Sequence, residues 1–309
     1  MRPGGVTVIV PAKDEAENLR RCLPSLAWAE AVFVVDSRSD DGTDRVVADH
    51  GATLVPFDFN GTYPKKKNWA LDNLPIRTEW VLIVDADEVV VPALAGEILR
   101  RTAADEADGF LINMNYHFLG RRIAHCGYNG AWNLRLFRHR LGRYERVPAT
   151  PGVEAGDNEV HEHVELAGRV RRLVHRLDHH AYPTIAAWVE KHGRYAAWEA
   201  ENFDRFLRDP IPGGIGRGKR FKRRLKKVYL RLPCRPLVRF VYAYLIRLGF
   251  LDGRPGLVFC ILLAYYEFLC GANRYAGRLR VADAEGMGAG QAGRIEPATA
   301  TGSRRAVSS

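Results

Sequence analysis

The strongest constraint on the fold is a pattern in the first third of the chain, where short apolar runs alternate with segments of helical periodicity. The runs are VTVIVPA (6–12), AVFVVD (31–36), TLVPF (53–57) and WVLIVD (80–85). Strands that are apolar at successive positions are buried on both faces, and strands separated by helices form parallel βαβ units. The pattern therefore predicts an α/β fold with a doubly wound, mainly parallel sheet. The helices are expected at 15–28, 39–51, 65–74 and 92–103.

Carboxylates stand at the carboxyl ends of three of these four strands. They are Asp14 and Glu15 after the first run, Asp36 at the end of the second, and Asp85, Asp87 and Glu88 at the end of the fourth. Open α/β sheets bind their ligands in the crevice outside the carboxyl ends of the strands. The acidic groups therefore predict one ligand site at this edge of the sheet.

The Asp85-Ala86-Asp87 sequence predicts a divalent-metal site. Where a strand breaks into a turn, two such carboxylates can approach one ligand, and hard oxygen donors suit Mg²⁺ or Mn²⁺. The turn after the first strand, PAKDEAEN, lacks both the G-x-G-x-x-G of a dinucleotide site and the signature of a P-loop. Phosphate groups are therefore expected to meet a metal and basic side chains.

Two groups of basic residues are candidates for binding phosphate. Lys65, Lys66 and Lys67 open the third predicted helix, and Arg135 and Arg138 lie in NLRLFRH. The alternative for both groups is an ordinary solvated surface.

Other polar residues have simpler interpretations. Ser39 is the expected N-cap of the helix over 39–51. The histidines of the middle segment lack the H-E-x-x-H spacing, so no zinc site is predicted. They are His161, His163, His175, His179 and His180.

Charge and hydrophobicity are unevenly distributed along the chain. Its net charge of +10 makes an anionic partner plausible, and residues 217–231 hold nine Lys or Arg in fifteen positions. Aromatic-rich apolar segments follow, but PGLVFCILLAYYEFLCGA contains Glu267 and falls short of the roughly 20 apolar residues of a spanning helix. We expect this region to lie in the interface of an anionic membrane; the alternative is a buried helical subdomain with a solvated basic face.

Five cysteines, an odd number with no C-x-x-C pair, favour a reducing compartment. No signal-peptide pattern is found at the N-terminus, so we expect a cytoplasmic protein held peripherally on the inner face of the cytoplasmic membrane. The predicted parts begin with 1–104 and 105–208, the two halves of one α/β domain. Residues 209–281 form the helical basic and apolar extension, and 282–309 a disordered tail.

Four motifs in order, VIVPAKDEAENL, VVDSRSDDGTD, KKKNWAL and VLIVDADE, resemble the nucleotide-binding half of family 2 glycosyltransferases, which have the GT-A fold. The resemblance covers roughly residues 5–100, and it implies that 1–104 is the nucleotide-sugar-binding half and 105–208 the acceptor-binding half of the domain. WNLRLFRH, VHEHVELAG and LDGRPGL resemble, more loosely, the branch of lipopolysaccharide inner-core glucosyltransferases. Asp14-Glu15 stands where the family usually has Asn-Glu, and Ser37-Arg38 where a small or acidic residue is common. Both departures leave the base and the sugar open.

The resemblance implies an inverting transfer from a nucleotide-diphosphate sugar, with Mg²⁺ or Mn²⁺, to a glycolipid or lipopolysaccharide-type hydroxyl. It implies that Asp14 or Glu15 and Asp36 contact the nucleotide, that Asp85 lies near the ribose and that Asp87 binds the metal. We assign Lys66, Lys67 and Arg135 to donor binding. The reaction also needs a general base. Among Asp157, Glu159, Glu162 and Glu165 we select Glu162, because the resemblance places a carboxylate of this segment at the acceptor.

Four alternatives are kept. A polyprenyl-phosphate glycosyltransferase would share the donor site. A sugar nucleotidyltransferase would share the sheet and the acids, but it normally has a Gly-rich basic loop after its first strand. A nucleic-acid-binding protein would fit the charge, yet no recognition motif is present, so no nucleic-acid partner is expected. A non-catalytic peripheral membrane protein leaves the acids at the strand ends unexplained.

Overall fold

The computed structural model describes residues 2–127, 132–146, 163–208 and 217–292. The chain divides into two compact units. One comprises Met1–Trp188 with Phe240–Ile261, and the other comprises Val189–Arg239 with the chain from Leu262 onward. The two predicted halves, 1–104 and 105–208, both contribute strands to one sheet of the first unit.

The first unit begins with the four predicted strands. They are β1 (Arg2–Ala12), β2 (Ala31–Asp36), β3 (Thr53–Pro56) and β4 (Thr78–Ile83). They lie in the order β3-β2-β1-β4 and all pair in parallel, which confirms the predicted arrangement. β1 begins before the predicted Val6, because Arg2 already pairs with Thr78 ahead of an irregularity in the register.

The connecting helices are also close to the predicted ranges. They are α1 (Ala16–Cys22), the 3₁₀ helix η1 (Leu23–Leu26), α2 (Thr43–Asp49), α3 (Lys66–Asn73) and α4 (Pro92–Ala103). The single helix expected over 15–28 is divided. Pro24 lies in the first turn of η1, and proline cannot donate the backbone hydrogen bond that a continuing α-helix requires.

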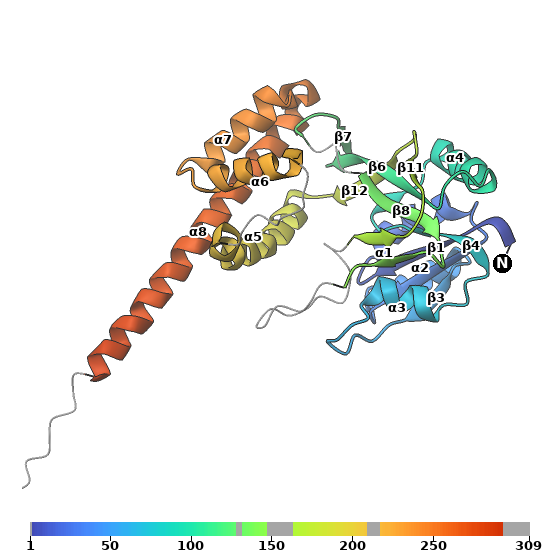
Figure 1. The fold of residues 1–309 in the computed structure, drawn as a ribbon, viewed down its shortest axis with the longest axis horizontal. Helices are drawn as coiled ribbons and strands as arrows, with labels where there is room; N and C mark the ends of the chain where they lie inside the picture. The colour runs from blue at the N-terminus through green and yellow to red at the C-terminus, as the bar shows by residue number, and fades with distance from the viewer. Residues whose placement is uncertain (1, 128–131, 147–162, 209–216, 293–309) are drawn as a thin grey trace, which may run out of the picture. The chain divides into compact units, whose positions relative to one another are not determined.

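The remaining strands make the sheet mixed. They are β5 (Glu88–Val89), β6 (Gly109–Phe118), β7 (Arg121–Ile123), β8 (Trp132–Arg138), β11 (Val170–Arg172) and β12 (Leu177–Tyr182). The order continues β4-β8-β6-β12-β5, with β8 antiparallel to β4 and β12 parallel to β6 (Figure 1). β9 (Gly142–Tyr144) and β10 (Val164–Leu166) form a separate antiparallel pair.

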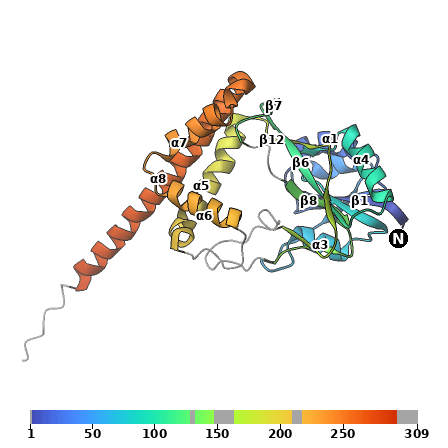
Figure 2. The same ribbon diagram turned by 45° about the horizontal axis from the view of Figure 1, so that its top comes forward.

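Both faces of the sheet are buried. Trp80, Leu82 and Val84 pack in one hydrophobic cluster with α1, α2 and α4, whereas Val81 and Ile83 pack in a second with α3. Figure 2 shows α1 and α4 on one side of the sheet and α3 on the other. Side chains that alternate along β4 therefore contribute to both hydrophobic clusters.

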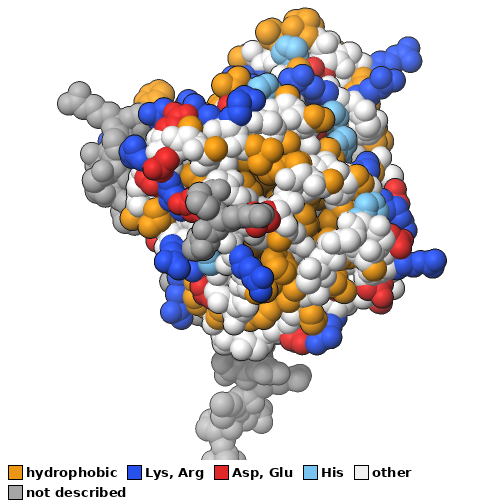
Figure 3. Space-filling model, turned by 90° about the vertical axis from the view of Figure 1, so that its right-hand side faces the viewer, with side chains coloured by type: hydrophobic (Ala, Val, Ile, Leu, Met, Phe, Trp, Pro, Cys, Tyr) orange, Lys and Arg blue, Asp and Glu red, His pale blue; other side chains and the backbone are white. Residues whose placement is uncertain are grey.

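Figure 3 shows one face of the molecule, where basic and acidic side chains are interspersed, so its surface charge is mixed in sign.

The first unit also includes a return segment from the C-terminal part of the chain. It contains a π-helical turn, η2 (Tyr242–Ile246), the 3₁₀ helix η3 (Gly249–Asp252) and the start of α8. Asp252 accepts hydrogen bonds from the backbone N–H groups of Ala124 and His125 at 3.1 and 2.9 Å. These bonds attach the segment that follows β7 to η3.

The C-terminal part of the chain is helical. Its helices are α5 (Ile185–Arg208), α6 (Arg217–Leu230), α7 (Arg235–Val241) and α8 (Gly253–Ala292). α8 continues to Ala292, although we expected a disordered tail from 282. Glu267 lies within α8, since glutamate is a good helix former, and Nη1 of Arg235 approaches its carboxylate at 3.8 Å. Within the described residues, Gly249–Leu279 is long and apolar enough to cross a membrane, contrary to our expectation, although a third (33%) of its most apolar window is buried.

Candidate functional site

The loops after β1 and β2 are held together by hydrogen bonds. The backbone N–H of Asp14 donates to Oγ of Ser39 at 2.7 Å, and the N–H of Ser39 donates to Asp36 at 2.9 Å. Asp14 has a left-handed backbone (φ 54°) and a half-exposed side chain, whereas Asp36 is 7% exposed. Asp14 is therefore open to a ligand. Asp36 mainly fixes the shape of the loop.

Ser39 is not the helix cap that we expected. Gly42 occupies the N-cap of α2, and Asp41 accepts bonds from the N–H groups of Thr43 and Ala16 at 3.1 and 2.8 Å. The N-cap position of α1 is Glu15, whose carboxylate accepts a bond from Nδ2 of Asn18 at 2.6 Å. Local propensity had placed a cap three residues too early.

A cluster of opposite charges lies at the end of β4. Nη2 of Arg135 on β8 lies 2.8 Å from Oδ2 of Asp85 and 3.2 Å from Oε1 of Glu88, which is fully buried. Nζ of Lys67 on α3 lies 3.3 Å from Oδ1 of Asp85 and 5.3 Å from the centre of the Tyr144 ring. From the sequence, Lys67 and Arg135 could also have been ordinary solvated surface residues. The structure excludes that alternative, because both side chains are nearly buried.

Burial and charge act in opposite directions on these groups. Burial by itself would raise the pKa of Asp85, but Arg135 and Lys67 outweigh it and hold that pKa far below its usual range. Burial raises the pKa of Glu88 to about 7, although Arg135 opposes the shift. Burial would lower the pKa of Arg135, yet the two carboxylates keep it well above its usual value. The site thus contains a permanently ionised pair beside a carboxyl group that titrates near neutrality.

Lys66 does not face the same cluster. Its side chain is 2% exposed, and Nζ donates to the carbonyl oxygen of Ala12 at the end of β1 at 2.7 Å. This bond joins the start of α3 to the strand end that precedes Asp14. We had assigned Lys66 to donor binding; the contact shown is a bond that positions the loop.

His179 on β12 meets Asp87. Its Nε2 lies 3.1 Å from Oδ2 of Asp87, and Asp87 raises the pKa of this imidazole against the effect of burial. Two ligand atoms bound at right angles to one ion, each at about 2.1 Å, would be about 3 Å apart, so this pair fits a shared divalent cation. Sequence reasoning assigned Asp87 to the metal and missed His179. No local signal links residues 92 positions apart in the chain.

The remaining candidates lie elsewhere. Arg138 belongs to a structural network, since it contacts Glu79 and Asp105 and lies over the ring of Trp80, 5.0 Å from its centre. Glu162, with Asp157 and Glu159, lies outside the described residues. Glu165 is exposed on β10.

Comparison with known proteins decides the family. Residues 7–155 match the family model described as Glycosyl transferase family 2. This match assigns residues 7–155, just under half of the chain, to the family. The matched residues include every acidic group at the strand ends and Arg135, and the mixed sheet with helices on both faces is the GT-A-type fold of such glycosyltransferases.

Several relatives are themselves described as glycosyltransferases. The chain is 25% identical over 272 residues to an "Uncharacterized glycosyltransferase" of Rickettsia bellii, covering 85% of this chain and 84% of that one. It is 30% identical over 138 residues to the lipopolysaccharide core biosynthesis glycosyltransferase LpsC of Rhizobium meliloti, covering 43% of this chain and 50% of LpsC. Among solved structures, Staphylococcus aureus TarS 1–349 aligns over 87% of this chain and 89% of its own, at 14% identity and a TM-score of 0.40. That likeness is too distant to inform on substrates.

Proposed function

We propose that this family 2 glycosyltransferase transfers a hexosyl group, with inversion, from a nucleotide-diphosphate sugar to a hydroxyl group of a lipopolysaccharide-type or other lipid-linked acceptor. The observation that carries the proposal is the pairing of Asp87 with His179 beside the ionised cluster of Asp85, Arg135 and Lys67. These groups lie at the carboxyl end of β4, the edge at which such sheets bind ligands.

The basic side chains support a diphosphate at this edge. Nη1 of Arg135 is buried and has no hydrogen-bond partner among the described residues. A buried guanidinium N–H that lacks a partner is costly, and a phosphate oxygen is a strong acceptor for it. We propose that Arg135 donates from Nη1 to the donor while Nη2 stays bonded to Asp85 and Glu88.

Asp87 and His179 would hold Mg²⁺ or Mn²⁺. Bound there, the ion would supply Lewis-acid neutralisation of the charge on the diphosphate leaving group. Asp85, held by its ion pairs with Arg135 and Lys67, would accept a hydrogen bond from the ribose. Asp14 and the loop shaped by Asp36 would contact the nucleotide base.

Glu162 remains our proposed general base. A carboxylate within reach of the acceptor hydroxyl takes its proton as the oxygen attacks the anomeric carbon, and the nucleoside diphosphate leaves from the opposite face. We keep the lipopolysaccharide-type acceptor because LpsC is named for lipopolysaccharide core biosynthesis. The cytoplasmic face of the membrane is the proposed location, with the basic and apolar helices as the contact.

The donor site can be tested by measuring release of nucleoside diphosphate from a panel of nucleotide-sugars, with lipopolysaccharide core fragments and polyprenyl phosphates as acceptors. Activity should disappear in EDTA and return with Mn²⁺ or Mg²⁺. Asp87→Ala should lower kcat/KM about 100-fold or more, because several kcal/mol of charge stabilisation are removed. Asp72→Ala, at an exposed ion pair with Arg143, is the matched control. Full activity of Asp87→Ala would show that the metal assignment is wrong.

The same assay tests the proposed base. Glu162→Gln should lower kcat by about 10²- to 10⁴-fold with little change in donor affinity, since a general base acts in the transition state. Glu165→Gln, exposed on β10, is the control and should keep normal kcat. Equal activity of the two variants would show that Glu162 is not the general base and that another carboxylate has this role.

A further inference from the structure

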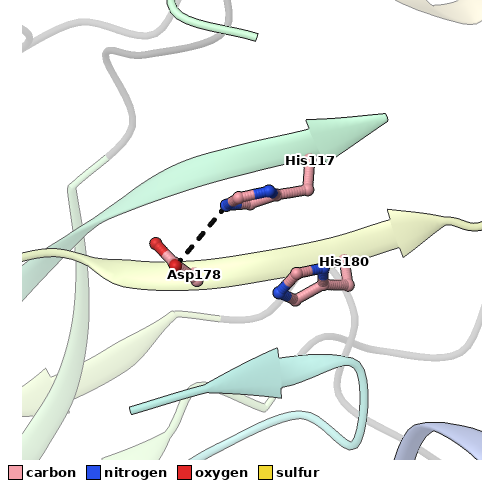
Figure 4. A group of neighbouring side chains, drawn as sticks. All are labelled: His117, Asp178 and His180. Atoms are coloured by element: carbon pink, nitrogen blue, oxygen red, sulfur yellow. Dashed lines mark ion pairs between the residues drawn. The ribbon is translucent and has the colours of Figure 1, made fainter. Parts of the chain in front are cut away.

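Behind the donor site, three side chains that the proposed reaction does not use form a second cluster. His117 lies on β6, and Asp178 and His180 lie on β12, the parallel neighbour of β6. Asp178 and His180 are alternate residues of one strand, so they share a face of the sheet. Figure 4 shows both imidazoles to the right of the Asp178 carboxylate, with the dashed line joining that carboxylate to His117. We propose that His117, Asp178 and His180 bind a divalent transition-metal ion of the zinc type.

The distances fit one ion. One ligand atom from each of the three residues lies within 4.8 Å of the other two. Nε2 of His117 is 3.5 Å from Oδ2 of Asp178. A tetrahedral ion with bonds of about 2.0–2.1 Å holds its ligand atoms about 3.4 Å apart, so this pair is already at ligand spacing. The rings of His117 and His180 are stacked, with centres 4.3 Å apart, so binding of the same ion requires the His180 ring to rotate until its lone pair points at that ion.

The polar surroundings favour ligation over an ordinary hydrogen-bonded cluster. Nε2 of His117 is buried and has no hydrogen-bond partner among the described residues. Buried polar atoms of native proteins nearly always have a partner, and a metal ion would provide one here. Nδ2 of Asn115 donates to Oδ1 of Asp178 at 2.8 Å. That bond orients the carboxylate with Oδ2 toward His117, as outer-shell partners do for ligating carboxylates.

The donor set distinguishes this ion from the one proposed at Asp87. Two imidazole nitrogens and one carboxylate oxygen suit Zn²⁺ or Co²⁺. The site proposed at Asp87 has only one imidazole and would be completed by oxygen atoms of the diphosphate and water, which suits Mn²⁺ or Mg²⁺. Three protein ligands leave a fourth position for water. An ion here would join β6 to β12, and His179 lies between Asp178 and His180 on the same strand with its side chain on Asp87. The inferred ion would therefore stabilise the position of β12, the strand that carries His179.

The test is a titration of metal-free protein, prepared with EDTA and desalted, with Co²⁺ followed by visible absorption. The parent protein should bind one Co²⁺ with the intense bands of four-coordinate cobalt, and Zn²⁺ should displace it. His117→Ala and His180→Ala should each weaken binding at least about tenfold, and Asn115→Ala by about 10- to 100-fold, the usual effect of an outer-shell partner. Asp87→Ala should keep the bands. His175→Ala, whose imidazole contacts Glu97, is the matched control.

Unchanged Co²⁺ binding in folded His117→Ala and His180→Ala proteins, checked by circular dichroism, would overturn the inference. A second measurement needs no substitution of His117, Asp178 or His180. Asp87→Ala protein incubated with Zn²⁺ and passed through gel filtration should retain about one zinc per chain by mass spectrometry; no retained zinc would also overturn it. Neither readout depends on sugar transfer, so this inference and the proposed function can fail separately.

Discussion

Arg135 shows at the scale of one residue why this site is sensitive to substitution. It is the shared partner of Asp85 and Glu88, and all three lie at the end of β4. Arg135→Met leaves Asp85 with Lys67 as its nearest cation and Glu88 without a counter-charge. Removing one partner of a buried ion pair typically costs about 3–5 kcal/mol, so we expect the free energy of unfolding in urea to fall by that amount.

A double variant separates this electrostatic effect from lost packing. Glu88→Gln removes the buried carboxyl group, whose pKa is raised by burial to about 7. The pair Arg135→Met and Glu88→Gln should therefore be more stable than Arg135→Met alone. If the two substitutions simply add, the destabilisation comes from packing, and the ion-pair explanation is wrong.

At the scale of elements, Glu97 connects α4 to the segment before β12. Its buried carboxylate accepts bonds from the N–H groups of Val174 and His175 at 2.9 and 2.8 Å, and from Nδ1 of His175 at 2.8 Å. Burial would raise the pKa of Glu97, but these hydrogen bonds lower it overall. A carboxyl group whose pKa is lowered on folding stabilises the fold above its unfolded pKa, about 4.3 for Glu, and loses that contribution as the pH falls.

Glu97→Gln should therefore destabilise the protein by about 1–3 kcal/mol at pH 7, because one amide oxygen cannot replace two charged acceptors. The difference between variant and parent should shrink as the pH is lowered below about 4. Urea unfolding at a series of pH values measures it. Glu190→Gln, in an exposed pair with Arg194 on α5, is the control and should show almost no difference. A pH-independent difference for Glu97→Gln would contradict the charge explanation.

At the scale of the whole molecule, the second unit presents features of a membrane-binding surface. On α6, Phe221, Leu225 and Val228 are exposed at helical spacing, and on α8 so are Phe268, Tyr275 and Leu279. Exposed apolar stripes of this kind, in a chain whose Lys and Arg concentrate in 217–231, favour insertion at an anionic interface.

We therefore expect the protein to float with liposomes that contain anionic lipid and to be released by high salt. Charge reversal of Arg224, Lys226 and Arg231 to Glu should reduce the floated fraction several-fold, because each basic residue near the surface contributes about 1 kcal/mol. Extraction of membranes with alkaline carbonate separates two arrangements. Release indicates an interfacial helix, and retention indicates that α8 spans. Flotation unchanged by the charge reversal would contradict the electrostatic contact.

The sequence predicted local features well and long-range contacts poorly. The strands 31–36 and 53–57 and the helix over 92–103 were confirmed almost to the residue, because apolar runs and helix-start signals such as Pro92 depend only on neighbours in the chain. Three findings could not be predicted from the sequence. Lys66 and Lys67 are buried, Arg138 belongs to a different network from Arg135, and Ser39 bonds within the loops after β1 and β2. Each depends on an element that approaches from elsewhere in the chain.

The sequence by itself determined the parallel strands, the carboxylates at their ends and thereby the edge of the sheet at which we propose that the donor binds. Both follow from the order of apolar and polar residues along the chain. Only the tertiary structure decided that His179 meets Asp87 while Asp178 and His180 meet His117. β12 joins β6 through long-range pairing, and its alternating side chains divide between the two faces of the sheet. The alternation within β12 cannot reveal which residues of other elements contact each of its faces.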